Sequence, residues 1–152
     1  MLNGDAHHSL EVEARISRCR IFKDSNGRNI SQMPLTILYA EDHATVRLAV
    51  QETLEREGWH VEACTNGLIA LSRLEGEASY ALLIFDNDLP GVDGIELTRR
   101  ARSLPHRQGT PVVLFSAGEV EAEARRAGAD AFLRKPQDLG RLVGTVKELV
   151  ER

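Results

Sequence analysis

The chain has 152 residues, which is enough for one globular domain with a terminal extension but too few for two domains of ordinary size. Its composition, 42% hydrophobic and 28% charged with a formal net charge of -4, disfavours direct binding of nucleic acid. It has no run of about 18 apolar residues for a membrane helix and no signal-peptide core, so we expect a cytoplasmic protein that does not contact the membrane. Cys19 and Cys64 lack metal-site spacing and are interpreted as reduced thiols.

Residues 1–33 show no sustained helical or strand periodicity, and we interpret them as an N-terminal extension of a domain at 34–152. Asn26-Gly27 is a strong signal for a two-residue hairpin turn, which predicts pairing of Cys19–Phe22 with Arg28–Ser31. An isolated hairpin is only marginally stable, so a flexible extension is an equally good interpretation.

The first part of the domain predicts two units of strand and helix. Leu35–Ala40 is a continuous β-prone run, as expected for a strand that is buried on both faces. The amphipathic segment Ala44–Glu57 follows as a predicted helix. Trp59–Cys64 is the next predicted strand, and a short helix over 68–74 begins behind an N-cap at Asn66.

The remaining part of the domain repeats this alternation. Ala81–Phe85 is a third apolar strand, and a helix over 93–103 follows it after a turn at Pro90-Gly91. Strands over 111–115 and 130–133 flank a brief predicted helix over 119–127.

The last predicted helix, 139–150, has the clearest periodicity and is expected to begin behind Asp138 as its N-cap. Its apolar stripe consists of Leu139, Leu142, Val143, Val146, Leu149 and Val150. Five strands that alternate with five helices predict a doubly wound α/β domain, with a parallel sheet covered by helices on both faces. The sequence ends soon after this helix, so we expect no output domain downstream.

Polar residues follow four of the predicted strands: Glu41-Asp42, Asp86, Ser116 and Lys135. Ligands of such a sheet bind beyond the carboxyl ends of its strands, so these side chains are expected to meet at one edge. Three carboxylates in one place repel each other, and an oxygen-only ligand set favours Mg²⁺ or Mn²⁺ as their partner. With Lys135 and the Ser116 hydroxyl beside phosphoryl oxygens, the set suits phosphoryl transfer to a carboxylate.

Each of these residues also has an ordinary structural interpretation when it is taken alone. Asp42 could cap a helix, Asp86 could belong to a turn, Ser116 could be a cap, and Lys135 could be a solvated surface lysine. Their occurrence together at four strand ends favours the functional interpretation.

Four segments resemble the receiver domain of response regulators in bacterial two-component signalling. They read ILYAED at 37–42, LIFDNDLPGVDG at 83–94, LFSA at 114–117 and AGADAFLRKP at 127–136. The resemblance extends from Leu35 to Arg152. It implies a CheY-like, flavodoxin-like fold with strand order 2-1-3-4-5 in three α/β/α layers.

The resemblance also implies a phosphorelay chemistry for the strand ends. Asp86 would be the phosphoacceptor of a protein that promotes its own phosphorylation and dephosphorylation but is not otherwise an enzyme. Glu41 and Asp42 would bind Mg²⁺ directly or through water, with Asp86 and the backbone carbonyl of Asp88 as further ligands.

Further residues would carry the conformational switch. Ser116 would be the switch hydroxyl and Lys135 the phosphate-contacting lysine, with a cis bond before Pro136. Phe132 would be an aromatic that turns inward on activation, or else an ordinary core residue. The spacing between Ser116 and Lys135 is shorter than the family usually has, which predicts a shortened fourth helix.

We therefore predict a single-domain response regulator that is phosphorylated by a sensor histidine kinase, a histidine phosphotransfer protein or a small acyl phosphate. It would act on a downstream protein effector or on another copy of itself through its fourth and fifth helices. One alternative is a receiver-fold interaction module that works without phosphate. Another is an aspartate-nucleophile phosphatase of the haloacid dehalogenase type, since Asp86-x-Asp88 is its motif, although that family places the motif on its first strand.

Overall fold

The computed structural model describes residues 19–151 apart from 24 and 28. Its main sheet has five parallel strands in the order β4-β3-β5-β6-β7. These strands are β3 (Thr36–Ala40), β4 (His60–Cys64), β5 (Leu82–Asp86), β6 (Val112–Ser116) and β7 (Ala131–Arg134). Counted along the chain within this sheet, the order is 2-1-3-4-5, so the predicted flavodoxin-like topology is confirmed.

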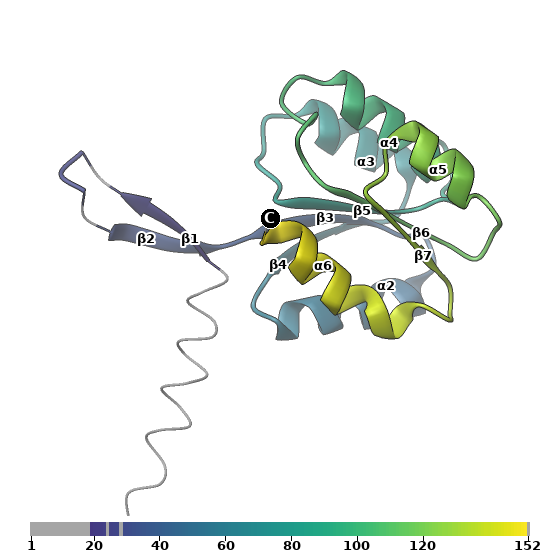
Figure 1. Ribbon diagram of the computed structural model, residues 1–152, viewed down its shortest axis with the longest axis horizontal. Helices are drawn as coiled ribbons and strands as arrows, with labels where there is room; N and C mark the ends of the chain where they lie inside the picture. The colour runs from purple at the N-terminus through teal and green to yellow at the C-terminus, as the bar shows by residue number, and fades with distance from the viewer. Residues whose placement is uncertain (1–18, 24, 28, 152) are drawn as a thin grey trace, which may run out of the picture.

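Helices cover both faces of this sheet and give the predicted three layers (Figure 1). The helical segments are α2 (Ala44–Arg56), α3 (Gly67–Glu75), α4 (Gly94–Ser103), α5 (Glu121–Ala127), the 3-10 turn η1 (Leu139–Arg141) and α6 (Leu142–Val150). Helices α2 and α6 pack on one face, and α3, α4 and α5 pack on the other. No helix among the described residues is long and apolar enough to cross a bilayer.

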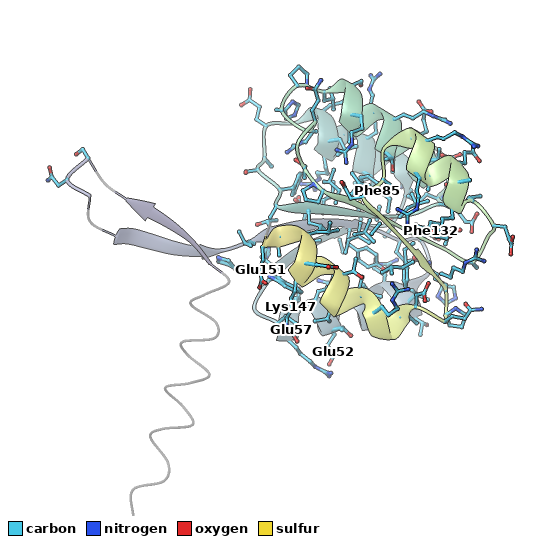
Figure 2. The ribbon with its side chains drawn as sticks, viewed as in Figure 1. Glu52, Glu57, Phe85, Phe132, Lys147 and Glu151 are labelled. Carbon is cyan, nitrogen blue, oxygen red and sulfur yellow. The ribbon has the colours of Figure 1, made fainter. Side chains whose placement is uncertain are left out.

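The core lies on both sides of the sheet because its strands are covered on both faces. Every residue of β5 and of β6 is buried, which explains why both segments are apolar without alternation up to their last residues, Asp86 and Ser116. Within β3, Ile37 and Tyr39 pack toward α2 and α6, whereas Leu38 packs toward α3, α4 and α5. Phe85 and Phe132 belong to the same layer as Leu38 (Figure 2). The carboxyl ends of β3 and β5 lie side by side between these two layers.

The start of α3 follows the sequence prediction, whereas the start of the last helical segment departs from it. Asn66 caps α3 by accepting a hydrogen bond from the Ile69 amide at 2.9 Å, as predicted. The predicted cap at Asp138 is wrong: its Oδ2 accepts from the Arg134 amide at 2.8 Å instead, and its backbone is not extended. Because that carboxylate closes the turn after β7, the last helical segment begins with the 3-10 turn η1, and α6 starts only at Leu142.

A two-stranded antiparallel hairpin precedes β3 and projects from the α/β layers (Figure 1). It consists of β1 (Cys19–Lys23) and β2 (Asn29–Pro34), with Phe22 opposite Ser31. A hairpin is therefore present as predicted, but its register differs from the prediction: Cys19–Phe22 pairs with Ser31–Pro34, and Lys23 pairs with Asn29 after a register shift. The rest of the predicted extension, residues 1–18, lies outside the described residues.

Candidate functional site

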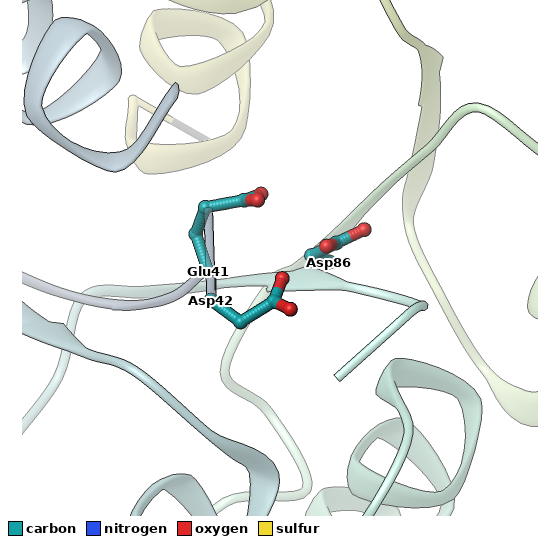
Figure 3. A group of neighbouring side chains, drawn as sticks. All are labelled: Glu41, Asp42 and Asp86. Atoms are coloured by element: carbon teal, nitrogen blue, oxygen red, sulfur yellow. The ribbon is translucent and has the colours of Figure 1, made fainter. Parts of the chain in front are cut away.

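Three carboxylates gather at the carboxyl edge of the main sheet (Figure 3). Glu41 and Asp42 follow β3, and Asp86 ends β5, the strand next to it. One carboxylate oxygen from each lies within 4.8 Å of the others. Glu41 and Asp86 are buried, with 1% and 4% of their surface exposed, whereas Asp42 faces solvent. The donor set consists of oxygen only and is open to water on one side, which fits a hard cation such as Mg²⁺.

Lys135 supplies the positive charge of this cluster. It follows β7, and its Nζ atom forms an ion pair with Glu41 Oε2 and lies 3.3 Å from Asp86 Oδ1. Since both carboxylates are buried, their charges depend on this ammonium group for compensation. The peptide bond between Lys135 and Pro136 is cis, as the resemblance implied.

The pKa of the Asp86 carboxyl is raised from 3.8 to about 6, chiefly because burial disfavours the charged form. The Lys135 ammonium lowers this pKa, and the charge of Glu41 raises it further. A hydrogen bond from the Asp88 amide to Asp86 Oδ1, at 3.3 Å, also favours the carboxylate. Asp86 is therefore mostly ionised near neutral pH, which is the state that a nucleophilic carboxylate requires.

The loop between β5 and α4, residues 87–93, is fixed at its start by hydrogen bonds of Asn87. The Asn87 side-chain oxygen accepts from the Ile95 amide at 3.1 Å, and the Asn87 amide donates to the Phe115 carbonyl at 3.3 Å. These bonds connect the loop to α4 and to β6. They define the position of Asp88, whose carbonyl is the fourth predicted metal ligand.

Ser116 and Phe132 lie on neighbouring strands behind the acidic cluster. Ser116 ends β6 and is fully buried, and its Oγ accepts a hydrogen bond from the Gly118 amide at 3.0 Å. Phe132, in β7, faces the core with 7% of its surface exposed, so the ring occupies an inward position in this structure. Helix α5, which follows β6, has seven residues.

Arg47 is a residue of this site that the sequence reasoning missed. Its guanidinium, on α2, donates to the backbone carbonyls of Glu41 at 3.0 Å and of Asp42 at 3.2 Å. A cation in the first turns of the helix that follows an acidic pair was the available signal. Asn87 was also missed as a site residue, although it lies within the segment that carries Asp86.

The chain matches the response regulator receiver domain over residues 37–147. It belongs to this family. Among curated relatives of this receiver domain, the phosphate regulon transcriptional regulatory protein PhoB of Rhizobium meliloti is 36% identical over 119 residues, covering 76% of this chain and 52% of PhoB. The transcriptional regulatory protein ResD of Bacillus subtilis is 34% identical over 119 residues, covering 76% of this chain and 48% of ResD. The chain thus spans about half the length of these relatives.

Solved receiver structures share the fold. A CheY-like response regulator receiver domain protein from Methanospirillum hungatei superposes with a TM-score of 0.70 at 29% identity, covering 77% of this chain and 94% of that one. The response regulator TrrA of Thermotoga maritima, solved in complex with Mg²⁺ and BeF, superposes with a TM-score of 0.67 at 27% identity, covering 76% of this chain and 98% of that one.

Proposed function

We propose that this receiver domain accepts a phosphoryl group on Asp86 in a Mg²⁺-dependent reaction and acts as a response regulator. The observation that carries the proposal is the contact of Lys135 Nζ with both Glu41 and Asp86, beside the exposed carboxylate of Asp42. This arrangement unites a buried nucleophile, oxygen donors for a metal and a cation for the phosphoryl group. In this proposal the chain promotes its own phosphorylation and dephosphorylation and has no other substrate.

The proposed transfer forms a bond between an Asp86 carboxylate oxygen and phosphorus. The bond that breaks is the P–N bond of a phosphohistidine or the P–O bond of an acyl phosphate, and the leaving group keeps the electron pair. Glu41, Asp42, Asp86 and the Asp88 carbonyl would hold Mg²⁺, or Mn²⁺, which neutralises charge on the phosphoryl oxygens when it is bound. The Mg²⁺ and BeF in the Thermotoga maritima structure support this assignment.

The proposed switch uses Ser116 and Phe132. Phosphorylation would draw the Ser116 hydroxyl away from the Gly118 amide that it now accepts from, toward a phosphoryl oxygen. Phe132 pairs in register with Leu114 of β6, and its ring is already buried in this structure. In the proposed switch the ring occupies this inward position when the loop after Ser116 moves.

The proposed signalling role places the receiver domain at 34–152, after an N-terminal extension at 1–33, in the cytoplasm. Its phosphoryl donor would be a sensor histidine kinase or a histidine phosphotransfer protein. Its output would be contact with a protein effector, or with a second copy through α5 and α6. Coupling between such sites is typically about 1–3 kcal/mol, which changes partner affinity by about five- to 150-fold.

The decisive experiment is intact-mass spectrometry after incubation with acetyl phosphate and Mg²⁺. We expect one added phosphoryl group on the wild type, none on Asp86→Asn, and none after Mg²⁺ is removed with EDTA. Asp93→Asn is the matched control, because Asp93 caps α4 from the same loop and asparagine caps a helix equally well. Equal phosphorylation of Asp86→Asn and the wild type would contradict the proposal.

A phosphate-independent interaction module is the second candidate, which the short α5 leaves open. In that case the wild type would bind Mg²⁺ but gain no phosphoryl group from either acetyl phosphate or a phosphorylated histidine donor. Steady release of inorganic phosphate from many ester substrates would instead support the phosphatase alternative.

A further inference from the structure

The first turn of α3 touches the loop that carries the predicted metal ligand Asp88. The Gly67 amide, at the start of α3, donates to the Pro90 carbonyl at 2.9 Å. Leu68 lies over the same loop, because a Cβ placed on Gly91 would lie 2.8 Å from Leu68 Cγ. Helix α3 therefore contacts the middle of a loop whose start is fixed by Asn87.

Gly67 leaves no room for a side chain at this contact. A Cβ on Gly67 would lie 1.7 Å from the Val92 carbonyl oxygen, 2.6 Å from its carbon and 2.7 Å from its nitrogen. All three atoms belong to the backbone, so no side-chain rotation can relieve the overlap. Any residue other than glycine must push the loop at Val92 away from α3 or shift α3 itself.

Movement of Val92 is transmitted to the acidic cluster through a short segment of chain. The loop begins directly after Asp86, and the Asp88 amide donates to Asp86 Oδ1 at 3.3 Å. At its far end, Gly94 donates to the Asn87 carbonyl at 3.3 Å, which closes the loop upon itself. Both ends of the loop are held by hydrogen bonds of Asn87. A displacement of Val92 must therefore be taken up by the residues between these ends, which include Asp88.

We propose that Gly67 is a positioning residue for Mg²⁺ binding: its missing side chain lets α3 hold the loop where the Asp88 carbonyl can bind the metal. The inference rests on the proposed function of Asp86 and its metal ligands. In this proposal Gly67 acts through the loop and does not itself bind the metal or the phosphoryl group. Substitutions of residues that support metal ligands typically weaken metal affinity by about ten- to 100-fold.

The test compares Mg²⁺ affinity, measured by isothermal titration calorimetry, for the wild type, Gly67→Ala and Gly144→Ala. Gly144 is the matched control, since it also lies in a helix, α6, but a Cβ there meets no atom within 4 Å. We expect Gly67→Ala to raise the Kd for Mg²⁺ by about ten-fold or more and Gly144→Ala to leave it unchanged. An unchanged Kd in Gly67→Ala would overturn the inference.

A second readout separates positioning from loss of stability. The rate of phosphorylation by acetyl phosphate should recover in Gly67→Ala when the Mg²⁺ concentration is raised. The reason is that the substitution changes only the apparent dissociation constant for Mg²⁺. Leu54→Ala, a core variant in α2 far from this loop, should lower stability without changing that constant. A similar increase of the constant in Leu54→Ala would overturn the inference.

If Gly67→Ala does not fold, Leu68→Ala carries the test, because Leu68 is 61% exposed and its removal leaves the core intact. A Kd for Mg²⁺ raised about two-fold or more would support the inference, and an unchanged Kd would overturn it. If the wild type binds no Mg²⁺, the proposed function is wrong and the inference with it. If the wild type binds Mg²⁺ and Gly67→Ala binds it equally well, only the inference is wrong.

Discussion

The Nζ atom of Lys135 lies 3.3 Å from the Oδ1 atom of Asp86, although their strands, β7 and β5, are separated in the sheet by β6. The same Nζ atom pairs with Glu41, which follows β3. The Lys135 side chain thus reaches past the end of β6 and connects β7 with the carboxylates at the ends of β5 and β3. Two carboxylates that would otherwise repel each other are held together by it.

Lys135→Met should destabilise the metal-free protein, because it leaves Glu41 and Asp86 buried without a compensating charge. Breaking a buried ion pair by removing one partner costs about 3 kcal/mol or more. Urea unfolding in EDTA measures the loss. Lys147→Met is the control. Lys147, on α6, pairs with Glu57, the residue after α2, at 3.2 Å near the surface (Figure 2). Loss of this surface pair should cost less than about 1 kcal/mol. Equal losses in the two variants would contradict the assigned role of Lys135.

Asp86→Asn should stabilise the metal-free protein at neutral pH. The pKa of Asp86 is about 6 in the folded state and 3.8 in the reference state, so the folded protein binds more protons between these values. Wild-type stability therefore falls as pH rises from about 4 to about 6, and the asparagine variant lacks this loss. We expect a gain of up to about 3 kcal/mol at pH 7.5 that vanishes near pH 4, in urea unfolding with EDTA.

Asp138→Asn should show the opposite pH dependence. Hydrogen bonding from the Arg134 amide lowers the pKa of Asp138, so its ionised form stabilises the folded state at neutral pH. The variant should be less stable than the wild type at pH 7.5, and the difference should shrink as pH falls through the lowered pKa. A pH-independent difference in either Asp86→Asn or Asp138→Asn would show that the pKa shift is not the cause.

Ser116→Ala should still take up a phosphoryl group but should lose the response of the following loop. The variant keeps Asp86, Lys135 and the metal ligands, and losing the bond from the Gly118 amide costs about 1 kcal/mol. Hydrogen exchange of residues 117–120, with and without Mg²⁺ and beryllofluoride, should change in the wild type and not in the variant. Ser103→Ala, which removes an exposed hydroxyl on α4, should behave as the wild type. A full response in Ser116→Ala would exclude this hydroxyl from the switch.

Leu54→Ala and Leu48→Ala test the orientation of α2. Leu54 is fully buried against the sheet, so its truncation should cost about 2–5 kcal/mol. Leu48 on the same helix is 63% exposed, and its truncation should change the free energy of unfolding by less than about 0.5 kcal/mol. Thermal or urea unfolding of the two variants provides the comparison, and similar costs would mean that α2 is rotated about its axis.

The types and order of the strands and helices could be read from the amino-acid sequence, and so could the edge of the sheet at which Glu41, Asp42, Asp86, Ser116 and Lys135 lie. These follow from local rules: apolar runs predict buried strands, helical periodicity predicts the layers, and alternation of the two predicts parallel strands with a common carboxyl edge. The cap at Asn66 is equally local, since its side chain bonds to an amide three residues away. The family resemblance then assigned roles to residues that this topology had already grouped.

The partner of each polar group depends on tertiary contacts that the sequence does not reveal. Asp138 has the sequence of a helix cap, yet its carboxylate bonds to Arg134 because the turn after β7 brings that amide closer. Lys135 pairs with Glu41, and Gly67 meets Val92, because α3 and the sheet edge bring distant segments into contact. Such pairings depend on distances of a few ångströms between elements, and the periodicity of a sequence carries no information about those distances.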